Sequence, residues 1–276
     1  MNEKNKNLVI RIVSAVILLP IVLLLLIQGG LYSAVLLGVA AAICASEYYL
    51  ITQKTLSPAA WVGIVLAGVL PFLPLRNPER TGEGAFWIMA AYFFFAFTYH
   101  LIRGPLPEAP VRVAHLLTGF FYGAVGLTAV SALRLMPNGM AWVIAALVIT
   151  WANDSAAYFA GRFLGRHKLY PAVSPNKTWE GFFGGMVGSV GGMFIARAFF
   201  YPTVFTVADC VFLGIFGGIL GPIGDLCESM LKRAYGAKDS GIAIPGHGGI
   251  LDRIDALIFN APLVFVYITF VRALLA

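Results

Sequence analysis

Towards the C-terminal end of the chain, four side chains that could take part in chemistry recur at helical spacing. They are Asp225, Glu228, Ser229 and Lys232, at positions i, i+3, i+4 and i+7. In a helix this spacing places all four on one face. Two carboxylates, a hydroxyl and an ammonium group on one face indicate a ligand-binding site. A simpler interpretation stays open, in which the helix end is amphipathic and Lys232 pairs with Asp225 or Glu228.

Directly before this face, the segment Gly221-Pro222-Ile223-Gly224 interrupts an apolar run. Because proline and glycine disfavour the interior of a helix, we expect the helix to break at this point. A broken helix at membrane depth is tolerated where it lines a watery cavity, so the expected break also favours a site.

A glycine-rich segment follows, Pro245-Gly246-His247-Gly248-Gly249, preceded by Lys238-Asp239-Ser240-Gly241. Backbone N–H groups beside glycines can approach an anion closely. Three nearby basic side chains supply positive charge for phosphate groups; they are Lys232, Arg233 and Lys238. We expect His247 to contact phosphate or to shape the loop, although the segment alone would also fit an ordinary turn.

A second acidic pair, Asp252 and Asp255, flanks Arg253 just before the last apolar run. Together with Asp225 the pair offers hard oxygen ligands suited to Mg²⁺, which usually takes one or two carboxylates plus substrate phosphates and water. The alternative is that the two acids only stabilise the N-terminus of a helix. The candidate metal ligands are Asp225, Glu228, Asp252 and Asp255.

Two polar segments lie upstream, Asn153-Asp154-Ser155 and Ser174-Pro175-Asn176-Lys177-Thr178-Trp179-Glu180. Ionisable groups at membrane depth are energetically costly, so Asp154 inside an apolar run indicates a function. Anchoring at the membrane surface explains the basic residues between the two segments. It does not explain Asp154 or the polar run that contains Lys177.

The elements that must position these residues lie in a membrane. Hydrophobic types make up 59% of the 276 residues and charged types only 12%, too few to cover a soluble surface. Basic residues on cytoplasmic loops and beside anionic lipid headgroups are expected to account for the net charge of +6. The sequence has no stripe of basic and aromatic residues, so nucleic acid is not expected as a partner. The three cysteines lack CxxC spacing, so neither a zinc site nor a disulfide framework is expected.

We therefore expect an all-α, polytopic transmembrane protein with about nine spans. The expected spans cover residues 8–27, 31–51, 59–75, 84–102, 113–135, 140–160, 181–201, 207–231 and 256–275. The first run resembles a signal peptide but is longer than a usual signal core, so we interpret it as a retained span. Most basic residues, Lys4 and Lys6 among them, fall inside when the N-terminus is cytoplasmic.

The two parts of the chain differ in polarity. Residues 1–150 are expected to form a transmembrane scaffold, and residues 151–276 a catalytic region with cytoplasmic loops. Glycines recur at small-xxx-small spacing in the runs 181–201 and 207–231. Such spacing predicts close helix packing, with dimerisation as a further use.

The C-terminal segments together resemble the phosphatidate cytidylyltransferase family, the integral-membrane CDP-diacylglycerol synthases. The matching pattern is Ser229-Met-Leu-Lys232-Arg233, Lys238-Asp239, Pro245-Gly-His247-Gly-Gly249 and Asp252-Arg253-Ile-Asp255. The segments at 153–155 and 174–181 are also similar to family motifs. The specific resemblance covers residues 150–260, whereas residues 1–150 match only in being several hydrophobic spans.

The resemblance implies that CTP and phosphatidate react to CDP-diacylglycerol and pyrophosphate, with Mg²⁺ required and a monovalent cation such as K⁺ beside it. It also implies a homodimer in a bacterial inner membrane, with a site open to the cytosol. The expected catalytic residues are Asp225, Lys232, Arg233, Lys238, Asp239, His247, Asp252, Arg253 and Asp255. The expected substrate-binding residues are Asn153, Asp154, Ser155, Ser174, Lys177, Ser229, Gly246, Gly248 and Gly249. By family analogy, Asp225 and Asp252 are the leading metal ligands.

Two other functions compete with this hypothesis. A CTP-dependent lipid kinase of the membrane would release CDP in place of pyrophosphate. A transporter of anionic solutes would also place charge inside the membrane. Transporters, however, often repeat their helix interruptions in both halves, and here the interruptions and acids concentrate in one half.

Overall fold

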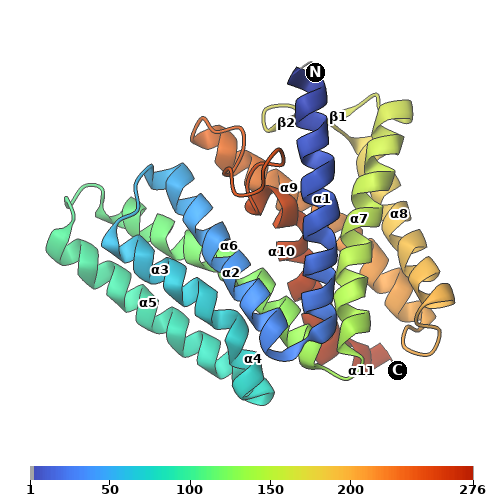
Figure 1. Ribbon diagram of the computed structural model, residues 1–276, viewed down its shortest axis with the longest axis horizontal. Coiled ribbons are helices and arrows are strands. Elements are labelled where there is room, and N and C mark those ends of the chain that lie inside the picture. Colours follow the sequence, from blue (N-terminus) through green and yellow to red (C-terminus); the bar gives the residue numbers. More distant parts are fainter. Residues whose placement is uncertain (1–2, 276) are drawn as a thin grey trace. The chain divides into compact units, whose positions relative to one another are not determined.

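The computed structural model describes residues 3–275, without the side chains of residues 3–8, 273 and 275, and is almost entirely helical (Figure 1). The side chains of Lys4 and Lys6 therefore lie outside the described part. Within that part, nine segments are long and apolar enough to cross a membrane. They are Val9–Gln28, Gly30–Gln53, Pro58–Arg76, Pro78–Arg103, Ala109–Leu135, Gly139–Leu164, Trp179–Phe199, Val207–Ala234 and Leu251–Val271. The nine expected spans are confirmed, with ends that differ by a few residues.

The chain forms two compact units, each built from two stretches of sequence. The first contains Met1–Leu135 and Ala237–Arg253, and the second contains Met136–Gly236 and Ile254–Ala276. This division differs from the expected boundary at residue 150. The glycine-rich segment packs with N-terminal helices, although it lies far from them in the sequence.

The first unit is a helical bundle. Its elements are α1 (Glu3–Gln28), α2 (Gly30–Gln53), α3 (Pro58–Val69), η1 (Leu70–Phe72), α4 (Leu73–Arg76), η2 (Pro78–Arg80), α5 (Thr81–Arg103) and α6 (Ala109–Leu135). Helix α2 packs against α3 and α6, and α5 also contacts α6 (Figure 1). Gly119 and Gly123 of α6 face Tyr49 and Ala45 of α2 so closely that any Cβ would clash. Small residues thus bring the two helices together.

The second unit consists of three packed long helices, a hairpin and the C-terminal helices. Its elements are α7 (Gly139–Leu164), β1 (Lys168–Tyr170), β2 (Ser174–Thr178), α8 (Trp179–Phe199), α9 (Val207–Ala234), α10 (Leu251–Val266), the π-helix η3 (Tyr267–Val271) and α11 (Arg272–Leu275). Residues 251–253 of α10 belong to the first unit. Helix α8 packs against both α7 and α9.

The glycine stripes serve helix packing, as the sequence predicts. A Cβ at Gly184, Gly188 or Gly192 of α8 would strike small residues of α7. A Cβ at Gly214 or Gly218 of α9 would strike the backbone of α8. Without Cβ atoms at these positions, the three helices approach closely enough to form one packed layer.

The expected helix break at Gly221-Pro222 is wrong, because α9 runs without interruption from Val207 to Ala234 with Pro222 inside it. Proline lacks the N–H that would bond the carbonyl of Gly218, four residues earlier. The Nδ2 of Asn153 donates to that carbonyl at 3.1 Å. A side chain from α7 thereby satisfies the acceptor that proline leaves open, and the helix continues.

Candidate active site

A cavity of about 500 Å³ opens in the second unit among α7, β2, α8 and α9. Its lining residues are Asn153, Asp154, Ala157, Tyr158, Gly161, Arg162, Leu169, Asn176, Lys177, Thr178, Gly181, Phe182, Pro222 and Asp225. We call it the acidic cavity. Two motifs far apart in the sequence meet here, since Asp154 comes from α7 and Lys177 from β2. The volume falls within the usual range for small-molecule sites.

The β1–β2 hairpin and the start of α8 position Lys177. Strand β1 pairs antiparallel with β2, with Lys168 opposite Thr178. The Oγ1 of Thr178 accepts from the N–H of Gly181 and caps the N-terminus of α8. The carboxylate of Glu180 accepts from the backbone N–H of His167 and contacts the His167 ring at 2.6 Å. The hairpin is therefore held to the helix that follows it.

Inside the acidic cavity, the Nζ of Lys177 lies 2.6 Å from Oδ2 of Asp225. The charges of Asp154 and Asp255 each interact with those of Asp225 and Lys177. Asp225 thus pairs directly with Lys177, and the charges of Asp154 and Asp255 act on both. Carboxylates at membrane depth are costly, and a bound cation would stabilise them.

The donor chemistry of the acidic cavity fits Mg²⁺, although no complete metal cage is present. Within residues 3–275, no three His, Cys, Asp or Glu side chains converge closely enough to hold a metal ion by themselves. Mg²⁺ rarely uses such a cage, because one or two carboxylates with substrate phosphates and waters satisfy it. Asp225, which lines the cavity, and Asp255, whose charge interacts with that of Asp225, could supply those carboxylates.

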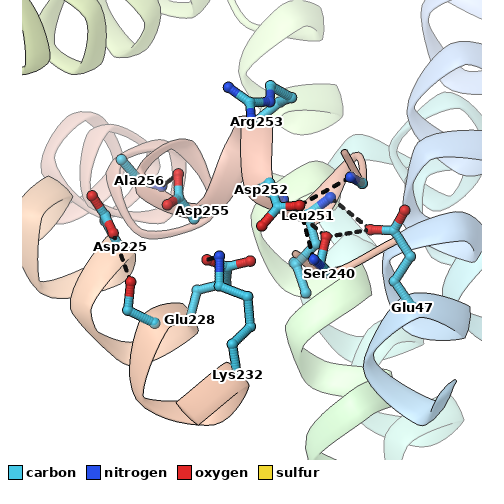
Figure 2. A network of polar contacts seen from close by, with 12 residues as sticks. Glu47, Asp225, Glu228, Lys232, Ser240, Leu251, Asp252, Arg253, Asp255 and Ala256 are labelled. Atoms are coloured by element: carbon cyan, nitrogen blue, oxygen red, sulfur yellow. Dashed lines mark hydrogen bonds and ion pairs between the residues drawn. The ribbon is translucent and has the colours of Figure 1, made fainter. Parts of the chain in front are cut away.

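The polar face of α9 forms the side-chain pairs that its spacing allows. The Oγ of Ser229 donates to Oδ1 of Asp225 at 3.2 Å, and Lys232 pairs with Glu228 (Figure 2). Glu228 is only 1% exposed. The simpler interpretation of a Glu–Lys bridge therefore holds for this part of the face, and metal binding by Glu228 stays a prediction.

Tyr158 and Arg162 form a basic and aromatic wall of the acidic cavity. The Nη1 of Arg162 donates to the hydroxyl of Tyr158 at 2.9 Å, and the guanidinium lies 6.0 Å from the rings of Tyr158 and Phe163. The i, i+4, i+8 spacing of Asp154, Tyr158 and Arg162 predicts one shared helical face, and all three residues line the cavity. Membrane-surface anchoring is the simpler interpretation of Arg162.

In the first unit, residues 237–250 form a loop that we call the glycine-rich loop. Gly246 and Gly248 have φ angles of 76° and 87°, a region that favours glycine. The backbone N–H of Ile244 donates to the carbonyl of Gly248 at 2.9 Å and closes a tight turn. Glycines at these two positions are therefore required by backbone conformation, whatever the loop binds.

Asp252 holds the two ends of the glycine-rich loop together. Its Oδ2 accepts from the backbone N–H groups of Ser240 and Gly249, each at 2.9 Å (Figure 2). The backbone N–H of Asp252 donates to Oγ of Ser240 at 3.2 Å. Asp252 thus binds N–H groups of the loop, and both the helix-terminus interpretation and its role as a metal ligand stay predictions.

Other predicted residues of the glycine-rich loop divide into structural and exposed groups. The guanidinium of Arg253 donates to the carbonyl of His247 at 2.6 and 3.0 Å, and Nδ1 of His247 lies 3.0 Å from Oγ of Ser14. His247 and Arg253 therefore shape the loop. Lys238 and Asp239 are exposed.

Three predicted residues of the second unit have contrasting surroundings. Asn153 is buried and lines the acidic cavity, but its amide donates to Ser189 and to the Gly218 carbonyl. Ser155 is exposed, and Ser174 begins β2 without lining the cavity. Substrate binding by these three residues stays a prediction.

With this geometry established, comparison with known proteins identifies the family. A sequence model described as "Cytidylyltransferase family" matches residues 9–271. The chain belongs to this family.

Several curated relatives cover almost the whole chain. A phosphatidate cytidylyltransferase of Staphylococcus epidermidis (strain RP62A) is 32% identical over 267 residues, covering 92% of this chain and 96% of the relative. One of Synechocystis sp. (strain PCC 6803) is 33% identical over 288 residues, covering 94% and 95%. One of Staphylococcus aureus (strain COL) is 32% identical over 266 residues, covering 92% and 96%. The similarity therefore includes the N-terminal helices, for which the sequence motifs offered no specific match.

Proposed function

We propose that this protein transfers the cytidylyl group of CTP to phosphatidate, giving CDP-diacylglycerol and pyrophosphate. The observation that carries the proposal is the acidic cavity, where Lys177 of β2 pairs with Asp225 of α9 beside Asp154 of α7. Membership of the cytidylyltransferase family and the names of the relatives support the same reaction.

In the proposed reaction, a phosphate oxygen of phosphatidate attacks the α-phosphorus of CTP. A new P–O bond forms, and the bond from the α-phosphorus to the oxygen bridging to the β-phosphate breaks. Its electron pair leaves with pyrophosphate. The attacking oxygen is already anionic near neutral pH, so no general base is required. The barrier comes from repulsion between two anions, which Lys177 and Arg162 would offset while holding the reactants in place.

We propose Mg²⁺ as the cofactor, with Asp225 and Asp255 as its protein ligands and substrate phosphates completing the shell. The ion would neutralise charge on the phosphates of CTP. A monovalent cation such as K⁺ is proposed beside it. Removing divalent ions with EDTA should abolish turnover, and added Mg²⁺ should restore it. Turnover that persists without divalent ions would contradict the cofactor assignment.

We also propose a homodimer in a bacterial inner membrane, with a cytoplasmic N-terminus and the acidic cavity open to the cytoplasm. CTP is a cytosolic nucleotide, and the basic residues of the chain favour this orientation. Labelling of single cysteines from either side of sealed vesicles would test it. A label at residue 166 that reacts only from the external side would contradict the proposed orientation.

The decisive experiment supplies labelled CTP, Mg²⁺ and phosphatidate to the purified protein in lipid. We expect label in a chloroform-soluble product and one pyrophosphate per product formed. A phosphorylated lipid with CDP would identify the competing kinase. Solute flux in liposomes without CTP turnover would identify a transporter, and no product of any kind from well-folded protein would refute the proposal.

A further inference from the structure

Glu47, in the N-terminal part of the chain, has surroundings that no sequence motif indicates. It lies near the end of α2, within a membrane-spanning segment, and is only 4% exposed. A carboxylate buried at this depth is costly unless several donors satisfy it. The donors come from the glycine-rich loop, about two hundred residues away in the sequence.

Two hydrogen bonds join Glu47 to the loop, and a third joins it to Leu251, the first residue of α10. Its Oε1 accepts from the backbone N–H of Ile250 at 3.0 Å, and its Oε2 accepts from that of Leu251 at 2.9 Å. Oε2 also accepts from the hydroxyl of Ser240 at 3.0 Å (Figure 2). One carboxylate thus holds both ends of the loop, since Ser240 lies near its beginning and Ile250 at its end.

The backbone N–H groups of Ile250 and Leu251 lie at the start of α10 (Leu251–Val266). The first N–H groups of a helix have no partner within the helix, and a negative charge beside them is favourable. Glu47 therefore acts as an N-terminal cap supplied by another helix. It fixes where α10 begins, and α10 carries Asp252 and Asp255.

The contact with Glu47 explains why two positions of the loop are glycine. A Cβ added at Gly241 would lie 2.6 Å from Oε1 of Glu47. A Cβ added at Gly249 would clash with the Glu47 carboxylate and with Ser240. Their φ angles do not require glycine, so close approach of the backbone to Glu47 is what excludes a side chain.

Helix α1 adds contacts at the tip of the same loop. The Nε of Arg11 donates to the carbonyl of Gly246 at 2.7 Å. The hydroxyl of Ser14 lies 3.2 Å from the carbonyl of Pro245. The loop is thus held at its tip by α1 and at its ends by α2, within the first unit.

We propose that Glu47 is a positioning residue for the cytidylyl transfer, and that it acts by holding the glycine-rich loop and the start of α10 in their reactive geometry. The inference rests on the proposed function, because the loop carries the residues of the family pattern. Glu47 itself touches no substrate in this proposal. It holds the backbone N–H groups at the end of the loop and at the start of α10 in place.

The test compares wild type with Glu47→Gln in full-length protein reconstituted in lipid. Glutamine keeps the size of the side chain but replaces one acceptor oxygen with an NH₂ group that faces donors. We expect kcat to fall about 100-fold, the cost of a displacement near 1 Å, with the KM for CTP within about threefold of wild type. Hydrogen exchange of the backbone at residues 240–251 should accelerate.

Asp209 provides a matched control. It is 0% exposed and accepts from Tyr267 at 2.7 Å and from Arg272 at 3.0 and 3.1 Å, all within the second unit. Asp209→Asn also weakens a buried carboxylate network but leaves the glycine-rich loop unchanged. We expect a lower unfolding temperature with kcat per folded molecule near wild type.

Ser240→Ala keeps the inference testable if Glu47→Gln does not fold. It removes one Glu47 contact, and we expect kcat to fall about tenfold with faster exchange in the same segment. Backbone hydrogen exchange at residues 240–251 that is as slow as in wild type, in either folded variant, would overturn the inference. An equally large loss of kcat in Asp209→Asn would also overturn it. The exchange measurement needs no turnover, so it tests Glu47 even if the wild type proves to lack cytidylyltransferase activity.

Discussion

Glu47 and Asp252 of the first unit accept hydrogen bonds from backbone N–H groups and hold a loop in place, whereas Asp225 of the second unit pairs with the side chain of Lys177. The charges of Asp154 and Asp255 interact with those of Asp225 and Lys177. A carboxylate in this protein thus either holds backbone in place or takes part in a charged site, and the groups around it decide which.

This difference separates two kinds of substitution. In the first unit a change should act through the shape of the loop, and a residue of similar shape but different hydrogen bonding should be harmful. In the second unit a change should act through charge, and removing one negative charge should be harmful even where shape is kept.

The largest effect is expected for Asp225→Asn, which keeps shape but removes the charge that pairs with Lys177. We expect kcat to fall about 10³-fold, with expression and elution in detergent unchanged. Ser229→Ala is the control, because it removes a hydrogen bond to Asp225 without changing charge. Retained activity in Asp225→Asn would refute the charge-based role of the acidic cavity.

Gly249→Ala tests the shape-based role of the first unit. The added Cβ would clash with Ser240 and Glu47, and we expect kcat to fall about 100-fold because the loop must move. Gly191→Ala in α8 is the matched control, since no atom lies within 4 Å of the added Cβ. That variant should be as active as wild type and no less stable. If Gly249→Ala were as active as Gly191→Ala, the close contact of Gly249 with Ser240 and Glu47 would not matter for turnover.

Arg162→Ala distinguishes phosphate binding from membrane-surface anchoring. Arg162 lines the acidic cavity, so we expect the KM for one anionic substrate to rise about tenfold with kcat nearly unchanged. Arg166→Ala removes an exposed basic residue outside the cavity lining and should leave both constants unchanged. Steady-state kinetics with each substrate varied in turn would show the difference. The same small effect in both variants would favour anchoring.

The smallest effect concerns stability. Asn153→Ala removes the donor to the Gly218 carbonyl, and we expect a loss of about 1–3 kcal/mol in the free energy of unfolding. Pro222→Ala restores the backbone N–H that this carbonyl lacks. Asn153→Ala should therefore cost less free energy of unfolding in a Pro222→Ala background than in wild type, and thermal unfolding in detergent would measure the difference. If the effects of the two substitutions simply add, Asn153 does not compensate for the proline.

Much of the architecture was predictable because it depends on local composition. Within residues 3–275, nine segments are long and apolar enough to cross a membrane, a property that does not depend on how they pack. The pairs Asp225–Ser229 and Glu228–Lys232 also follow from spacing, since residues four apart meet on any helix. A gapped pattern in the C-terminal segments also indicates the family, which the match over residues 9–271 shows.

Contacts between distant segments were not predictable in this way. Sequence reasoning treated Pro222 as a helix breaker, because the partner for the Gly218 carbonyl lies on another helix at Asn153. It gives no sign of the hydrogen bonds that Glu47 accepts from Ile250 and Leu251, because these donors lie about two hundred residues further along the chain.

The sequence by itself determined which side chains are available and on which helical face each one lies, since those properties depend on composition and local periodicity. Only the tertiary structure decided that Lys177 pairs with Asp225 and that Glu47 holds the glycine-rich loop. A hydrogen bond or an ion pair forms only when two groups come within about 3 Å of each other. For residues far apart in the chain, that proximity depends on how the helices pack.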